Sequence, residues 1–268
     1  MNQIKFHKFH GTGNDFILVD NRNLLFQPTQ KQVAFLCHRR FGIGADGLIL
    51  LEKDNEYDFK MKYFNSDGNE SSMCGNGGRC IVAFASKLDI IKEHSTFKAI
   101  DGIHKGEILK NAGNIWDVKL KMNDVDLVEQ VSNIEYTVDS GSPHFIRWIE
   151  KIGTIDVVKE GSAIRNSDHY KVPGINVNFV EQNNSALSIR TYERGVEDET
   201  LSCGTGCVAA AIASEFNSSD GVFNKTLHTM GGDLMVSFKK TENKYTDVHL
   251  TGNAIMVYEG HLNLNTND

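Results

Sequence analysis

Two short stretches of this chain resemble each other, and they constrain the fold more than any other feature. CGNGGRCIVAFAS begins at Cys74, and CGTGCVAAAIAS begins at Cys203. Each is Cys-Gly-x-Gly followed by a small, apolar, Ala-rich run, which predicts a helix that begins next to the cysteine. The runs carry almost no charge, with only Arg79 and Lys87 in the first, so we expect each helix to be buried on all sides.

The residues before each stretch also match. A strand-like segment ends in an aromatic residue, Phe64 or Tyr192, and a polar, acidic loop follows over 65–73 or 193–202. A strand–loop–helix unit that recurs 129 residues along the chain indicates an internal duplication. We therefore predict an α+β fold of sandwich type with two pseudo-symmetric domains, each a mostly antiparallel β-sheet wrapped around one central helix.

Domain boundaries must be inferred from pattern, because the chain has only three prolines and no low-complexity linker. We place the N-terminal domain at residues 1–115 plus 252–268 and the C-terminal domain at 116–251. A helix is predicted over 29–40, ahead of Gly42. Strands are predicted where apolar residues alternate or run together, at 4–20, 47–51, 57–65, 116–122, 144–152, 175–180, 186–192, 234–238, 247–250 and 254–258.

The composition is that of a globular protein and argues against polyanionic partners. Of 268 residues, 40% are hydrophobic and 24% charged, and the formal net charge is −7. An acidic chain binds nucleic acid or an anionic membrane surface poorly through bulk electrostatics. The N-terminal residues hold no apolar stretch of signal-peptide length, and the longest uncharged run, 200–214, is too short to span a bilayer. We expect a cytoplasmic protein that uses neither nucleic acid nor a membrane as a partner.

The five cysteines do not describe a disulfide framework, because their number is odd and the chain is large. The spacings are C-x5-C from Cys74 to Cys80 and C-x3-C from Cys203 to Cys207, with no C-x-x-C pair and no histidine at zinc-finger spacing. We therefore expect no metal site. The thiols, Cys37 included, either fill the core or carry chemistry.

A thiol just before a helix, followed by glycines that leave the first-turn amides open, can do chemistry. The positive end of the helix dipole can lower a cysteine pKa from ~8.5 to ~3.5–7.5, and the open amides can bind a carboxylate or phosphate. The plain alternative is that Cys74 and Cys203 are small buried hydrophobes, the common fate of a free cysteine. Neither stretch has the Lys-Ser/Thr ending of a phosphate-binding P-loop.

Two such helix starts facing one ligand would allow inversion of a stereocentre. One thiolate removes a proton from one face of a carbon, and the other thiol donates to the opposite face. The helix amides would stabilise the carbanion next to a carboxylate, as an oxyanion hole does. No lysine lies in a recognisable pyridoxal context, so we expect no cofactor.

Motifs along nearly the whole chain resemble the diaminopimelate epimerases, cofactor-independent amino-acid isomerases of lysine and peptidoglycan biosynthesis. The matching segments are FHKFHGTGNDFILVD near the start, FGIGADG at 41–47, FNSDGNESSMCGNGGRC at 64–80, GSPH at 141–144, INVNF at 175–179, YERG at 192–195, ETLSCGTG at 199–206 and TGNAIMVYEG at 251–260. Their order and spacing are highly specific. Proline racemases and phenazine-type isomerases share the fold, but we do not expect them to carry GTGNDF and YERG together.

The resemblance implies epimerisation of LL-diaminopimelate to meso-diaminopimelate without a cofactor, by a chain that often forms a homodimer. It implies that Cys74 is the proton donor and Cys203 the acceptor, with the roles exchanging when the direction reverses. It also implies that His144 and Glu193 tune the pKa values of the two thiols.

The resemblance further implies a set of substrate contacts, in which Arg194 grips the distal carboxylate with a two-point fork. The implied contacts are Asn14, Asn65, Gly75, Asn76, Asn176, Glu193, Arg194, Gly204 and Thr205. Gly47 and Ser142 complete the set at positions where many members carry Gln and Asn. The loop at 195–200 is one residue longer and more acidic than the usual form.

Other interpretations remain open at this stage. The loop and the two substituted contacts also suit a non-catalytic amino-acid binding protein, or a related cysteine-pair racemase acting on another amino acid. A thiol redox module is a third possibility. Taken singly, each asparagine has a plain role in a turn, Glu193 and Arg194 have one as a surface ion pair, and His144 has a structural one.

Overall fold

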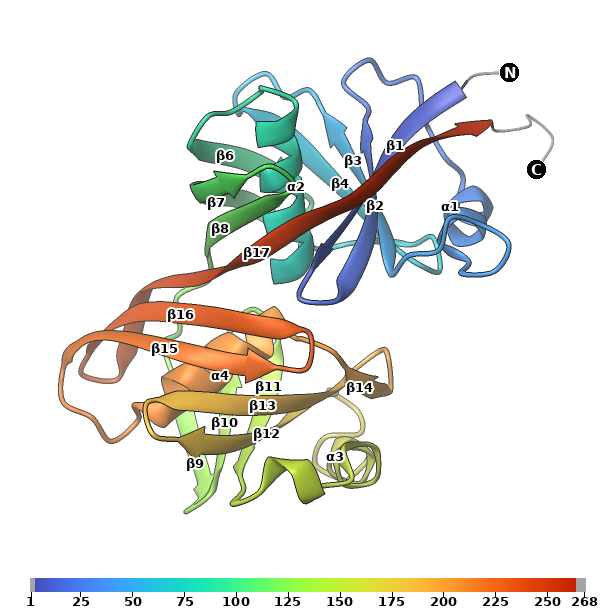
Figure 1. Cartoon of the computed structure of the whole chain (residues 1–268). Helices are drawn as coiled ribbons and strands as arrows, with labels where there is room; N and C mark the ends of the chain where they lie inside the picture. The colour runs from blue at the N-terminus through green and yellow to red at the C-terminus, as the bar shows by residue number, and fades with distance from the viewer. Residues whose placement is uncertain (1–2, 264–268) are drawn as a thin grey trace. The chain divides into compact units, whose positions relative to one another are not determined.

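The computed structural model describes residues 3–263. The chain divides into two compact units, each drawn in Figure 1. Unit 1 contains the described parts of Met1–Leu120 and Asn253–Asp268, and unit 2 is Lys121–Gly252. The domain boundaries expected at 115/116 and 251/252 stay predictions.

Unit 1 is built on a closed ring of strands. Its elements are β1 (Gln3–Gly11), β2 (Asn14–Asp20), α1 (Gln30–Cys37), β3 (Gly47–Glu52), β4 (Phe59–Asn65), β5 (Glu70–Ser71), α2 (Gly75–Lys87), β6 (His94–Ala99), β7 (Gly102–Ala112), β8 (Ile115–Lys121) and the end of β17 (Lys244–Asn263). Pairing runs from β1 through β2, β3, β4, β6, β7 and β8 to β17, which pairs back with β1. The β2–β3 and β4–β6 pairs are parallel and the rest are antiparallel. This ring of described strands has no open edge.

Unit 2 repeats the same order of pairings. Its elements are β9 (Val128–Ser132), β10 (Glu135–Asp139), β11 (Pro143–Trp148), η1 (Ile152–Thr154), α3 (Val157–Arg165), β12 (Asn176–Asn183), β13 (Ala186–Glu193), β14 (Asp198–Thr200), α4 (Gly204–Ser214), β15 (Gly221–Thr229), β16 (Gly232–Thr241) and the start of β17. Pairing runs through β9, β10, β11, β12, β13, β15, β16 and β17, with β11–β12 and β13–β15 parallel. A bridge between Val125 and Tyr245 joins β17 to the segment before β9.

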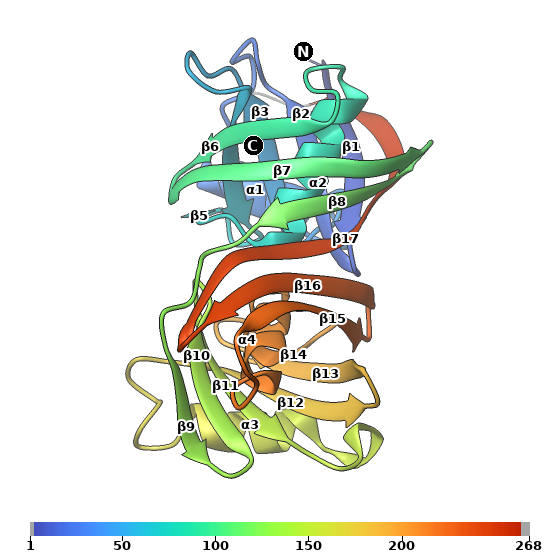
Figure 2. The same cartoon turned by 90° about the vertical axis from the view of Figure 1, so that its left-hand side faces the viewer.

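A buried helix packs against the strands of each unit. α2 contacts β1, β2, β3 and β7, and α4 contacts β10, β11, β12, β13, β15 and β16. Figures 1 and 2 show α2 lying against the strands of unit 1. All residues of α2 from Gly75 to Ala85 are buried, as are those of α4 from Gly206 to Ala213. Small residues permit this close packing: a Cβ added to Gly106 on β7 would lie 2.6 Å from Val82 Cγ2. The expected burial of both helices is therefore observed.

Unit 1 is a closed barrel of strands, because β17 returns to β1 and closes the sheet. Phe6 on β1 lies opposite Gly260 on β17, where a Cβ would lie 2.8 Å from the Phe6 ring. The segments expected as separate strands at 247–250 and 254–258 are both part of β17. Glycine at this position therefore lets the long strand come close enough to complete the ring.

Two further expectations differ in detail. The single strand expected at 4–20 is the β1–β2 hairpin, whose turn places Thr12 (φ 49°) and Gly13 (φ 86°) in the left-handed region. The helix expected over 29–40 ends at Cys37, because His38 already has an extended backbone.

Candidate active site

Cys74 is the N-cap of α2. Its backbone is extended, with φ −98° and ψ 151°, and its sulfur accepts a hydrogen bond from the Gly77 N–H at 3.3 Å. A Cβ on Gly77 would lie only 3.3 Å from that sulfur, so glycine keeps the approach open. The Cys74 side chain is partly exposed. The thiol therefore lies at the positive end of the helix dipole, within reach of a backbone donor.

A chain of polar side chains orients the groups around Cys74. Arg79 is fully buried and donates to Asn76 Oδ1 at 2.8 Å. Because a guanidinium can only donate, Asn76 presents its oxygen to Arg79 and its Nδ2 to Asn14 Oδ1, 3.3 Å away. Asn14 in turn donates to Asp46 Oδ2 at 2.7 Å and holds its own oxygen 4.0 Å from Cys74 Sγ. Asn14 and Asn76 thus lie at the thiol in orientations that Arg79 sets.

Asn65 and Gly47 face each other across the β3–β4 pair. The Asn65 side chain is exposed, whereas Gly47 is buried. A Cβ at Gly47 would lie 2.6 Å from both the Phe64 carbonyl oxygen and Tyr63 Cε2. A side chain there would require the strands to shift, so this position offers only backbone groups.

Cys203 is the N-cap of α4, but it lies in a different environment. It is 9% exposed, and its sulfur lies 3.5 Å from Thr205 Oγ1. Burial raises the pKa of this thiol well above its ordinary range, and the charge of Glu193 raises it further. Hydrogen bonds from Thr205 and the Gly206 backbone act in the opposite direction and offset only part of this rise. Desolvation of the thiolate therefore opposes the effect of the helix start at Cys203.

His144 reaches Cys203 through Thr205. The imidazole is fully buried, with Nε2 2.8 Å from Thr205 Oγ1 and Nδ1 3.0 Å from Asn178 Nδ2. Burial, followed by the nearby positive charge of Arg194, lowers the pKa of His144 to about 3. The ring is therefore neutral at physiological pH and cannot act as a cation beside the thiol.

Asn176, the first residue of β12, makes hydrogen bonds to the segments on either side of it. Its Nδ2 donates to Ser142 Oγ at 2.8 Å and to the Pro143 carbonyl at 3.2 Å. Its Oδ1 accepts the Arg194 backbone N–H at 2.9 Å. The exposed Arg194 guanidinium donates to the Pro173 carbonyl at 3.3 Å. Asn176 thus uses both amide hydrogens inside unit 2, whereas Arg194 has further donors at the surface.

Glu193 lies at the end of β13 and accepts a hydrogen bond from the Thr200 hydroxyl at 2.8 Å. In the loop at 195–200 that follows, carboxylates form ion pairs with basic side chains of unit 2. Arg190 makes a two-point contact with Glu199, at 2.6 and 2.7 Å. The acidic character of the loop is therefore partly neutralised by a neighbouring strand.

The predicted site residues fall into two groups, one in each unit. Unit 1 brings together Asn14, Cys74, Gly75 and Asn76, with Gly47 and Asn65 at one end of β3–β4. Unit 2 brings together Ser142, His144, Asn176, Glu193, Arg194, Cys203, Gly204 and Thr205. Thr12, Arg79, Asn178 and Thr191 also belong to these networks and were not predicted. Asn178 had one signal in the sequence, as a polar residue inside the largely apolar motif INVNF at 175–179.

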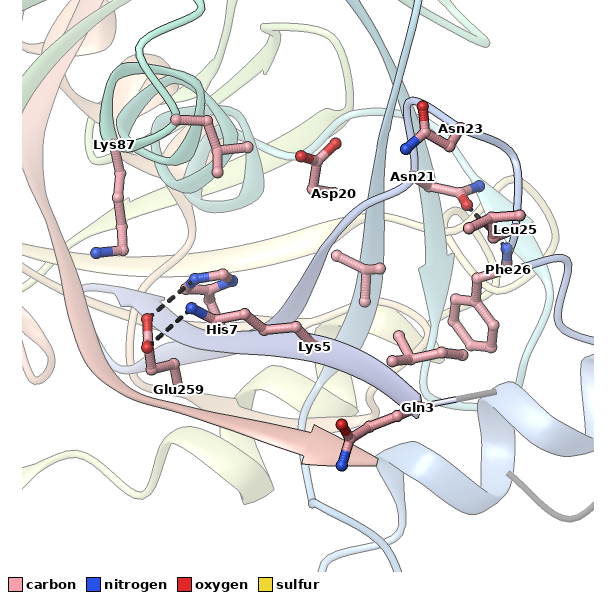
Figure 3. Close-up of a pocket in the computed structure, with 13 residues that line it drawn as sticks. Gln3, Lys5, His7, Asp20, Asn21, Asn23, Leu25, Phe26, Lys87 and Glu259 are labelled. Atoms are coloured by element: carbon pink, nitrogen blue, oxygen red, sulfur yellow. Dashed lines mark hydrogen bonds and ion pairs between the residues drawn. The ribbon is translucent and has the colours of Figure 1, made fainter. Parts of the chain in front are cut away.

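A cavity of about 430 Å³ lies elsewhere in unit 1 (Figure 3). Glu259 lies there between Lys5, at 2.9 Å, and His7, at 3.2 Å. Burial lowers the pKa of His7. None of the predicted site residues lines this cavity. It is therefore separate from the Cys74 network.

Over 3–263, no three His, Cys, Asp or Glu side chains are grouped so that they could hold a metal ion. Within the same range, no helix has the length and apolar character needed to cross a membrane.

Solved structures of low sequence identity share the fold. A PhzF-family phenazine biosynthesis protein from Bacillus anthracis has a TM-score of 0.76 at 15% identity, covering 98% of this chain and 100% of that one. A probable proline racemase from Agrobacterium radiobacter has a TM-score of 0.69 at 16% identity, covering 99% and 94%. The chain thus has the two-unit, strand-rich fold of these proteins.

Sequence comparison gives the family. Residues 6–128 and 136–257 match the family model for diaminopimelate epimerase. The diaminopimelate epimerase of Flavobacterium psychrophilum is 51% identical over 259 residues, covering 96% of this chain and 99% of the relative. That of Chlorobaculum tepidum is 42% identical, covering 95% and 99%. The chain belongs to the diaminopimelate epimerase family, a family of isomerases, which confirms the family expected from the motifs.

Proposed function

We propose that this protein interconverts LL- and meso-diaminopimelate by a two-base mechanism in which Cys74 and Cys203 act on one α-carbon. The observation that carries the proposal is the repeated helix start. In each unit a cysteine is the N-cap of a buried helix whose next residues are glycines and one short polar residue. Packing alone does not require a matched Cys-Gly at both positions.

The proton balance of the reaction requires one thiolate and one thiol. The thiolate takes the α-proton and becomes a thiol, while the other thiol gives its proton to the opposite face and becomes a thiolate. Cys74 donates and Cys203 accepts in one direction, and the roles exchange in the other. The raised pKa of Cys203 favours a resting form in which Cys203 holds its proton. Activity should therefore have a bell-shaped pH dependence, because both protonation states must coexist.

The substrate carboxylate next to the reacting carbon binds the open amides at the helix starts, at Gly75 and Asn76 and at Gly204 and Thr205. These donors and the helix dipoles stabilise the carbanion as it forms. Arg194 binds the distal carboxylate with its exposed guanidinium. Asn14, Asn65, Asn176 and Glu193 complete the contacts, and Gly47 and Ser142 contribute at the margin. His144 and Glu193 adjust the thiol pKa values.

The family relationship also supports a finer description of the fold. In this description the two units are pseudo-symmetric copies, each a mostly antiparallel sheet wrapped around its helix. The shared order of parallel and antiparallel pairings supports this interpretation. The burial of α2 and α4 supports it as well.

We further propose that the protein is a cytoplasmic homodimer and needs no cofactor. Its five cysteines form no disulfide, as is usual in a reducing compartment. The molar mass of the reduced protein, measured by light scattering, tests the dimer. The mass of a single chain would contradict it.

Turnover measurements with cysteine variants test the proposed function. Cys74→Ala and Cys203→Ala should each lower kcat by more than about 1,000-fold, because either one removes an obligatory acid or base. Cys37→Ala in unit 1 and Cys207→Ala in unit 2 are matched controls that should keep most of the activity. Native turnover in either of the first two variants would contradict the mechanism. Tight diaminopimelate binding without turnover by the unmodified protein would instead indicate a binding protein.

A further inference from the structure

The buried Asn178 has a fixed amide orientation. It lies on β12, and its Nδ2 is 3.1 Å from the Phe145 carbonyl oxygen and 3.0 Å from His144 Nδ1. Its Oδ1 accepts the Thr191 hydroxyl at 2.9 Å. A carbonyl oxygen can only accept a hydrogen bond, so the amide must turn its NH₂ group towards Phe145 and thereby towards His144.

This orientation determines the tautomer of His144. Nδ1 faces an N–H donor and must therefore accept, with its lone pair, the hydrogen bond from Asn178. Because burial keeps the imidazole neutral, its single ring hydrogen lies on Nε2. That hydrogen is donated to Thr205 Oγ1 at 2.8 Å.

The Thr205 hydroxyl then has one hydrogen of its own, and His144 does not need it. Cys203 Sγ, 3.5 Å away, can accept a hydrogen bond from this hydroxyl when the sulfur is a thiolate. With the opposite tautomer, Nε2 would carry a lone pair and would compete for the same hydrogen. The tautomer of His144, which does not contact the sulfur, thus determines whether the Thr205 hydroxyl is available to donate to Cys203.

The packing of α4 against Asn178 supports this arrangement. A Cβ added to Gly206 would lie 2.5 Å from Asn178 Oδ1, so glycine lets the amide approach the first turn of the helix. The charged groups that act on this network are Arg194, which lowers the pKa of His144, and Glu193, which raises that of Cys203. Neither supplies the hydrogen bond that Asn178 makes.

We propose that Asn178 is a positioning residue for the reaction: it holds His144 as the Nε2–H tautomer and so leaves the Thr205 hydroxyl to donate to the Cys203 thiolate. The catalytic use of that thiolate rests on the proposed function. No proton travels along the chain of contacts. The network supplies a hydrogen bond that is made when Cys203 has given up its proton.

Nitrogen NMR of the protein labelled with ¹⁵N-histidine tests the tautomer directly. The resonances of His144 can be assigned by their loss in His144→Gln, among the ten histidines of the chain. The expected result is a protonated Nε2 and an unprotonated Nδ1 at neutral pH. A protonated Nδ1 in the native protein would overturn the proposal without any variant of Asn178.

The hydrogen bond from Thr205 to the Cys203 thiolate is tested by the rate at which iodoacetamide alkylates Cys203. Mass spectrometry follows this rate. Asn178→Asp offers Nδ1 an acceptor, which should reverse the tautomer and slow alkylation of Cys203 at neutral pH about tenfold. Thr205→Val should slow it by a similar factor, and Thr205→Ser should restore it. Asn183→Asp, an exposed change on the same strand, is the matched control for charge and should change the rate less than about twofold.

The double variant Asn178→Asp with Thr205→Val separates this route from a direct effect of the new carboxylate. If Asn178 acts through Thr205, the double variant should be no slower than Thr205→Val alone. Additive slowing would overturn the proposal, since it would mean that the charge acts on the sulfur through space. If Asn178→Asp fails to fold, the NMR result and the Thr205 pair still decide the question. Native turnover by Cys203→Ala would defeat the proposed function but leave these two readouts unchanged, so the two failures are distinguishable.

Discussion

The two helix starts share a backbone motif and differ in nearly everything that surrounds the sulfur. Cys74 is partly exposed and lies beside two amide side chains that a buried guanidinium orients. Cys203 is buried, and it lies beside a hydroxyl that a neutral imidazole orients. The fifth residue after the cysteine is the cation Arg79 in α2 and the apolar Val208 in α4. A shared N-cap therefore does not give a shared electrostatic environment.

This difference suggests a division of labour between the two thiols. The dipole of a helix contributes at most about 2 kcal/mol at its first turn, whereas full burial of a charge costs more. Burial therefore dominates at Cys203 and holds its proton in place. Under the proposed mechanism, Cys203 is therefore the protonated thiol of the resting form and Cys74 supplies the thiolate.

The largest expected effect concerns Arg79, the fully buried cation whose hydrogen bonds orient the groups near Cys74. Arg79→Met should lower the free energy of unfolding by about 3 kcal/mol, because it removes the hydrogen bonds that the buried guanidinium donates to Asn76, Thr12 and the Gly75 carbonyl. Lys87→Met, at the partly exposed end of the same helix, should change it by less than about 0.5 kcal/mol. Denaturant melts of the two variants make the comparison. Equal stability would show that Arg79 does not hold the Cys74 network together.

The second prediction compares the reactivity of the two sulfurs. Iodoacetamide should alkylate Cys74 more than tenfold faster than Cys203 at pH 7.5, because each unit of pKa rise lowers the thiolate fraction about tenfold and burial hinders access. Site-resolved mass spectrometry of the reduced protein measures both rates in one sample. Faster alkylation of Cys203 would reverse the comparison.

The third prediction concerns the pH dependence of stability. A histidine in the unfolded chain becomes protonated as the pH falls below about 6.5. In the folded protein, the lowered pKa of His144 keeps the ring neutral down to about pH 3. Between these values the unfolded state binds more protons, so stability falls as the pH falls from 6.5 towards 3. By pH 4.5 this group should remove on the order of 2 kcal/mol.

The loss should be absent in His144→Gln, whose unfolding free energy should depend less steeply on pH than that of the unmodified protein. His228→Gln is the control, because His228 is largely exposed on β15. Melts at pH 7 and pH 4.5 give the difference. Parallel pH profiles for the native protein and His144→Gln would show that His144 is not held neutral.

The smallest effect is expected from the acidic residue near Cys203. Glu193→Gln removes a charge that raises the pKa of that thiol, so alkylation of Cys203 at neutral pH should become about three- to tenfold faster. Asp168→Asn, at a side chain that is 97% exposed, is the control and should leave the rate unchanged. Slower alkylation in Glu193→Gln would mean that the carboxylate acts on the sulfur in some other way.

The sequence was most informative where one residue carries a local geometric requirement. Cys74 and Cys203 were expected at helix starts, and both are N-caps, because Cys-Gly-x-Gly before an Ala-rich run allows little else. Strands with a single buried residue, such as β9, were missed, since they show no alternation of apolar and polar residues. The helix α3 was missed because Gly161 weakens its pattern, although that glycine is needed to fit against Tyr192.

Contacts that depend on long-range register could not be predicted. Asn178 lies against His144 only because β11 and β12 pair in parallel, with His144 opposite Asn176. The raised pKa of Cys203 depends on burial, which a local motif does not report. Ring closure depends on β17 pairing with β1 from the other end of the chain. These features require knowledge of which distant segments meet.

Isotope transfer from solvent tests most directly whether two separate thiols serve one carbon. LL-diaminopimelate is incubated in deuterated water, and the first product formed is analysed for deuterium at the inverted α-carbon. Because a thiol holds one proton and the donor has exchanged with solvent, the product should carry deuterium in nearly every molecule while unreacted substrate keeps its own hydrogen. Product that retains the original α-hydrogen would mean that a single base returns the proton it removed, which would contradict the two-thiol account.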